Sequence, residues 1–138
     1  MGWIGVLAFV TVLNAGEVDQ NIKRMFDLND VKYTINSDND FQLPFKDGNN
    51  VIVTSSVEDY RELTVREIWA ILDEVGKRNK TLLYSMLIEN FKKKIGAYSL
   101  VSRNDKIYAI YRVTLPAKAS WDELWSAILF CANQKLPE

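Results

Sequence analysis

Neighbouring carboxylates are the residues of this chain whose types could support acid–base chemistry. Such catalysis uses two carboxyl groups in different environments across a cleft, whereas adjacent ones on turns and helix starts are usually solvated or cap a backbone. The chain has no histidine, which removes the commonest general base and metal ligand. We therefore expect no catalytic residue, no metal site and no cofactor. The pairs concerned are Asp38 with Asp40, Glu58 with Asp59, Asp73 with Glu74, and Asp122 with Glu123.

Three other groups of residues suggest chemistry less strongly. The run Lys92–Lys94 is typical of a solubilising helix end, and a net charge of -1 gives no basic field for nucleic acid. Without such a field, Tyr98, Tyr108 and Tyr111 are expected to pack within the protein rather than stack on bases. The single cysteine, Cys131, has no basic neighbour within three residues, which favours a buried small apolar side chain and excludes an internal disulfide.

The first 16 residues differ from the rest because they carry no charged side chain. The apolar run Ile4–Leu13 is long enough for a signal-peptide core and too short for a helix that spans a bilayer. Small residues permit cleavage after Ala15, which would make the protein exported or periplasmic. Without cleavage the protein would be cytoplasmic, and the segment would be a buried strand or helix. Residues 17–138 are expected to form a single α+β domain.

The first half of that domain is predicted to be a helix followed by an antiparallel meander. Apolar residues recur at helical spacing from Glu17 to Leu28. Alternating apolar residues then predict strands within Val31–Ile35, Phe41–Phe45 and Val51–Thr54, separated by polar turns. The next segment, Tyr60–Val75, fits both periodicities, and its β-branched and aromatic residues favour a strand.

The second half is predicted to be a helix, a hairpin and a second helix. A stripe that includes Leu83, Met86, Leu87 and Phe91 predicts a helix over 81–95, with Gly96 as its left-handed terminator. Alternation over 98–115 around Asn104-Asp105 predicts two paired strands. Ser120 and Glu123 fit a capping box for a last helix that ends near Ala132.

Trp121 and Trp125 lie one turn apart on one face of this last helix, and Phe130 extends its apolar surface. Large rigid aromatic side chains are typical of binding hot spots. We predict that Trp121, Trp125 and Phe130 contact a partner, although packing of both indoles against the sheet is the alternative. On the first interpretation, Trp125→Ala should weaken association more than stability.

The order of these elements resembles the type III secretion chaperone-like superfamily, in its YbjN-type sensory branch. The resemblance covers residues 17–133 and is carried by Leu82–Phe91, by Gly96–Leu100 and by the Trp-Asp-Glu-Leu-Trp start of the last helix. It implies an α+β fold with helices packed on a twisted antiparallel sheet. It also implies binding of proteins or peptides, often as a dimer, without catalysis.

We therefore expect a non-enzymatic protein- or peptide-binding module that forms a homodimer, with no nucleic-acid partner and no membrane span. Two alternatives remain open. One is an exported or envelope-associated protein with a structural or ligand-carrying role. The other is a small enzyme that uses carboxylates or lysine in a pocket.

Overall fold

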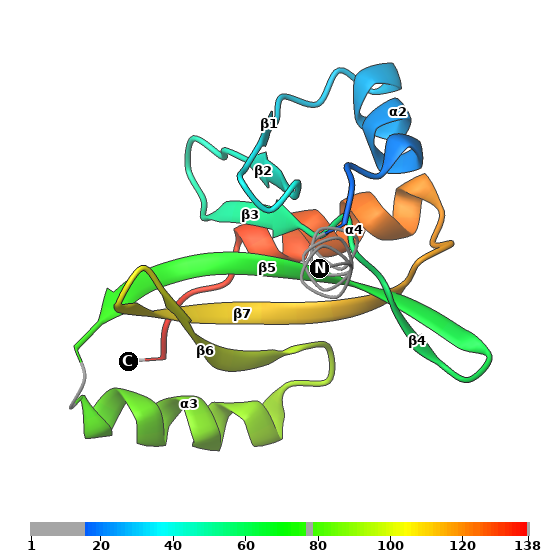
Figure 1. Cartoon of the computed structure of the whole chain (residues 1–138). Helices are drawn as coiled ribbons and strands as arrows, with labels where there is room; N and C mark the ends of the chain where they lie inside the picture. The colour runs from blue at the N-terminus through cyan, green and yellow to red at the C-terminus, as the bar shows by residue number, and fades with distance from the viewer. Residues whose placement is uncertain (1–15, 77–78, 138) are drawn as a thin grey trace, which may run out of the picture.

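The computed structural model describes residues 16–76 and 79–137. These residues form one antiparallel sheet with the strand order β1-β2-β3-β5-β7-β6, and β4 pairs with one end of β5. Figure 1 shows α2 and α3 at opposite ends of the sheet, with α4 behind its middle strands. The contacts agree, because α4 packs on β3, β5 and β7 whereas α3 packs on β6. The predicted α+β class, a twisted antiparallel sheet with helices packed on it, is confirmed.

Helix α2 and the meander share one aromatic core. Asp19 caps α2 (Gln20–Leu28) by accepting the backbone N–H groups of Asn21 and Ile22 at 2.9 and 3.1 Å. Phe26 on the buried side of α2 meets the ring of Phe41 edge-on, with centroids 5.3 Å apart. The meander strands are β1 (Thr34–Ile35), β2 (Phe41–Leu43) and β3 (Asn50–Val53).

A buried ion pair fastens the start of α2 to the sheet. Arg66 is 4% exposed, and its guanidinium donates to the Asp19 carboxylate at 2.7 Å and to the Thr54 carbonyl. Burial alone would raise the pKa of Asp19, but the Ile22 amide and Arg66 together lower it below its ordinary value. The charge of Arg66 is therefore compensated inside the protein, as a buried charge requires.

The ambiguous central segment is a strand, as its β-branched residues favour. β5 (Leu63–Val75) pairs with β3 on one side and β7 on the other, with a bulge between Ile71 and Asp73. The short strand β4 (Glu58–Tyr60) pairs with the first residues of β5 in an antiparallel hairpin. The sequence did not predict β4, because its three residues are exposed and lack an apolar alternation.

The helix–hairpin–helix order of the second half is also confirmed. The elements are α3 (Lys80–Lys92), β6 (Ala97–Arg103), β7 (Lys106–Pro116) and α4 (Trp121–Ala132). Both predicted turn residues, Asn104 and Asp105, have positive φ, which a tight two-residue hairpin turn requires. Ser120 and Glu123 form the predicted capping box.

Two predicted boundaries differ from the structure. Helix α3 ends at Lys92 and not at Ile95, and Gly96 occupies the left-handed region in the connection to β6 rather than at the helix end. The first two meander strands are also shorter than their alternating patterns, and the third is shifted by one residue toward the N-terminus. The apolar segment 1–15 and its predicted cleavage after Ala15 lie outside the described residues.

Candidate functional site

Helix α3 lies against the edge strand β6. The side chain of Asn90 holds it there by bonding to backbone groups of β6, as a neighbouring strand would. The Asn90 amide donates to the carbonyl of Tyr98 at 3.1 Å and accepts the backbone N–H of Tyr98 at 2.7 Å. Met86, one turn earlier, is the buried residue of α3. These contacts fix which side of the helix faces the protein.

The opposite side of α3 is apolar and exposed. Phe91 is 94% exposed and Tyr84 is 69% exposed, and Leu87 and Ile88 lie between them with more than half of their surface in water. Ile95, just beyond the helix, is exposed as well. A helix that is apolar on both sides is normally buried on both sides. We call Tyr84, Leu87, Ile88, Phe91 and Ile95 the α3 face.

The three lysines at the end of α3 have different roles. Lys92 is exposed and forms an ion pair with Glu89 at 3.2 Å, and Lys94 is also exposed. Lys93 turns inward, where its ammonium lies 5.6 Å and 5.7 Å from the ring centroids of Tyr98 and Tyr111. The solubilising role expected for the whole run therefore fits Lys92 and Lys94.

The predicted contact residues Trp121, Trp125 and Phe130 are half-buried on α4. The two indoles stack on each other with centroids 5.3 Å apart. Trp121 also meets the ring of Phe26, and Trp125 meets the ring of Phe45, at centroid distances of 6.0 and 6.1 Å. Phe130 instead packs on Tyr111 near α3, so the three side chains do not form one surface patch.

Two of the tyrosines and the cysteine are buried in the interior of the protein. Tyr98 and Tyr111 are buried edge-to-face neighbours with centroids 5.1 Å apart, and burial raises the pKa of both phenols. Cys131 is fully buried, which raises the pKa of its thiol to about 12. A thiol with that pKa is protonated at neutral pH and is a poor nucleophile.

Most of the paired carboxylates have structural partners. Glu123 accepts the backbone N–H of Ser120 at 3.0 Å, and this hydrogen bond lowers its pKa. Asp40 accepts the N–H of Ser55 at 2.9 Å, and burial raises its pKa. Asp38 instead forms an ion pair with Arg103 at the end of β6. These contacts cap, brace or bridge segments of the fold.

Over 16–76 and 79–137 no three or more carboxylate or cysteine side chains converge as a metal site would require. No helix within these ranges has the length and apolar character needed to cross a membrane.

The sequence pattern did not predict that the α3 face is exposed. Leu87 and Phe91 belong to the same predicted stripe as Met86, but in the structure Met86 is buried and the other two are exposed. A signal was present, since apolar residues occupy more of this helix than one buried face can use.

The fold defined by this sheet and its three described helices is that of the YbjN-type proteins. The comparison structure is the crystal structure of YbjN from E. coli, a proposed transcription regulator, which aligns at a TM-score of 0.55 over 81% of each chain. The two sequences are 9% identical. The expected resemblance is thus confirmed for the fold.

No family model matches the chain, and no curated protein matches its sequence.

Proposed function

We propose that this protein is a non-enzymatic binding module that forms a homodimer through the α3 face and engages a protein or peptide partner. The observation that carries the proposal is the row of exposed apolar side chains along α3. Water-exposed apolar surface of this kind is costly and typically marks an interaction site.

The size of the α3 face supports a protein partner. A buried aromatic side chain covers about 150–250 Å², so the exposed parts of these five side chains present on the order of 600 Å². Stable interfaces bury about 800 Å² on each partner. The α3 face supplies most of that area, and the exposed Lys92 and Lys94 beside it can supply the remainder.

The spacing of the α3 face supports a second copy of the chain as the occupant. Tyr84 and Phe91 lie symmetrically about the Leu87–Ile88 pair, at intervals of three, one and three residues. A twofold axis between Leu87 and Ile88 would set antiparallel helices side by side and place Tyr84 of one copy against Phe91 of the other. Such self-complementarity is what a twofold interface requires.

The test is the solution mass of Phe91→Glu compared with the wild-type protein and with Leu28→Glu. Leu28 is an exposed apolar residue on α2 and serves as the matched control. We expect light scattering to give a dimer for the wild-type protein and the control, and a monomer for Phe91→Glu. Thermal melts should show all three folded. A wild-type monomer, or a Phe91→Glu dimer, would contradict the proposal.

Trp121, Trp125 and Phe130 remain proposed partner contacts, because the stacked indoles keep part of their surface in water. Trp125→Ala should then weaken association more than it lowers the melting temperature. A large loss of melting temperature with unchanged association would instead assign Trp125 to the core.

The alternative of an exported or envelope-associated protein has its own measurement. Mass spectrometry of the mature N-terminus should find Gly16 first if residues 1–15 are removed on export, and Met1 or Gly2 if they are retained.

A further inference from the structure

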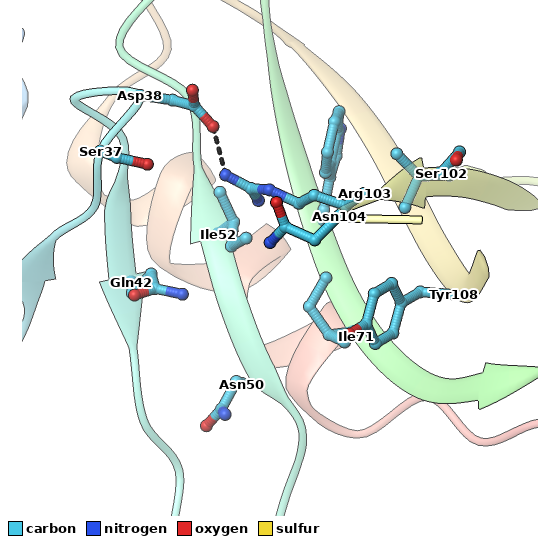
Figure 2. Close-up of a pocket in the computed structure, with 12 residues that line it drawn as sticks. Ser37, Asp38, Gln42, Asn50, Ile52, Ile71, Ser102, Arg103, Asn104 and Tyr108 are labelled. Atoms are coloured by element: carbon cyan, nitrogen blue, oxygen red, sulfur yellow. Dashed lines mark hydrogen bonds and ion pairs between the residues drawn. The ribbon is translucent and has the colours of Figure 1, made fainter. Parts of the chain in front are cut away.

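The face of the sheet opposite α4 holds a cavity of about 740 Å³. Six strands at a spacing of about 4.8 Å would place the two sheet edges about 24 Å apart if the sheet were flat. An ion pair nevertheless joins Asp38, in the β1–β2 turn, to Arg103, at the end of β6 (Figure 2). The sheet must therefore curl so that its two edges approach each other. The ion pair connects these edges at the mouth of the cavity.

The floor of this cavity is apolar and aromatic. Ile52 and Trp69 are register partners on β3 and β5, and Tyr108 approaches from β7. Ile52 is 2% exposed, whereas Trp69 and Tyr108 keep part of their surface in water. Such a floor offers flat surfaces on which a ring-shaped ligand can stack.

The rim is polar and provides both donors and acceptors. Gln42 and Asn50 contribute amides from β2 and β3, and Asn104 contributes a third from the β6–β7 turn (Figure 2). All three of these amide side chains line the cavity. An amide can donate and accept at once, which suits hydroxyl groups that also do both.

The charges around the cavity are paired. Asp38 neutralises Arg103, and Glu67 neutralises Arg112 at 3.0 Å beside Trp69. A charged ligand would have to compete with one of these pairs, whereas a neutral one would not. The volume is within the usual range of about 300–1,000 Å³ for small-molecule sites.

We propose that this concave face binds a neutral saccharide of one or two rings. One apolar face of a sugar ring stacks on Trp69 or Tyr108, and its hydroxyl groups bond to the amides of Gln42, Asn50 and Asn104. The site lies on a different surface from the α3 face, so either one can fail without the other.

The test is a titration of the full chain with maltose, cellobiose, lactose and methyl α-mannoside, followed by nitrogen–proton NMR. The readout is the indole N–H signal of Trp69, identified by its loss in Trp69→Leu. Glucose 6-phosphate and adenosine serve as charged and planar comparison ligands. We expect at least one neutral sugar to shift the Trp69 signal in a saturable way.

Three variants locate the site. Trp69→Leu should weaken binding, followed on the backbone amide signals, by about tenfold because the stacking surface is lost. Gln42→Ala should weaken it about fivefold through loss of a hydrogen bond. Asn21→Ala, an exposed amide on α2, should leave affinity within about twofold.

Three outcomes would overturn the proposal. The first is the absence of saturable shifts with every neutral sugar. The second is tighter binding of glucose 6-phosphate or adenosine than of any neutral sugar. The third is undiminished sugar binding by both Trp69→Leu and Gln42→Ala while their melting curves remain cooperative.

Discussion

Helices α3 and α4 are both apolar around most of their circumference. They differ in what surrounds them. α4 lies across β3, β5 and β7 and buries four residues, whereas α3 lies along the edge strand β6 and buries Met86. A helix over the middle of a sheet finds apolar neighbours on two or three sides. A helix at an edge finds them on one side, and its remaining apolar surface is left for another molecule.

The largest expected effect is the difference in the free energy of unfolding between truncating a buried side chain of α4 and truncating an exposed one of α3. Ile128→Ala removes a fully buried side chain and should lower the free energy of unfolding by about 2–5 kcal/mol. Leu87→Ala removes an exposed side chain of similar size and should change it by less than about 0.5 kcal/mol in the monomeric Phe91→Glu background. Urea denaturation measures both. Equal losses would mean that α3 is buried within its own chain.

The next effect concerns the connection that places α3 beside the sheet. Gly96 has φ +73°, and a Cβ atom there would lie 2.5 Å from the Arg112 carbonyl oxygen and 2.7 Å from the Tyr111 ring. Gly96→Ala should therefore lower the free energy of unfolding by roughly 2–3 kcal/mol. Gly76→Ala is the control, because a Cβ atom there meets nothing within 4 Å and the φ of Gly76 is not positive. Similar denaturation midpoints for the two variants would contradict this account.

A smaller effect should follow from breaking the contact that holds α3 to β6. Asn90→Ala leaves the Tyr98 backbone groups without their partner and should lower the free energy of unfolding by about 1–3 kcal/mol. Amide hydrogen exchange should speed up in α3 and β6 before it does in α4. Glu89→Ala, which removes an exposed ion pair, provides the comparison. Uniform acceleration in both helices would show that α3 is not held independently.

The last effect is a pH dependence that arises from groups buried between the two helices. Burial raises the pKa of Tyr98 and Tyr111 above the ordinary value of about 10, so the folded state holds these protons more tightly than the unfolded state. Their contribution to stability is complete below pH 10 and is lost as the pH rises through the folded pKa values. Cys131, with a pKa of about 12, acts in the same direction.

Thermal melts between pH 8 and pH 11 measure this dependence. The melting temperature should fall with rising pH, and Tyr111→Phe should reduce the slope. A melting temperature that rises with pH across this window would contradict the assigned sign.

Local signals in the sequence predicted most of the fold. The capping residues Ser120 and Glu123 and the turn Asn104-Asp105 define α4 and the last hairpin without reference to distant residues. The α3 face could not be predicted in the same way, because periodicity defines a stripe but does not say which neighbours exist to cover it. The concave cavity depends on Asp38 and Arg103, which are 65 residues apart and meet only because the sheet curls.

The long strand β5 has a consequence for the order in which the chain folds. Its partner β7 starts 31 residues later, and the intervening chain consists of α3, β6 and their connections. The β6–β7 hairpin closes a loop of two residues and can form early, whereas the β5–β7 pairing requires a much longer loop closure and should limit the folding rate. The meander depends on β5 for its place in the sheet. We therefore expect the hairpin to be structured in the transition state and α2, with its Arg66–Asp19 tie, to dock last.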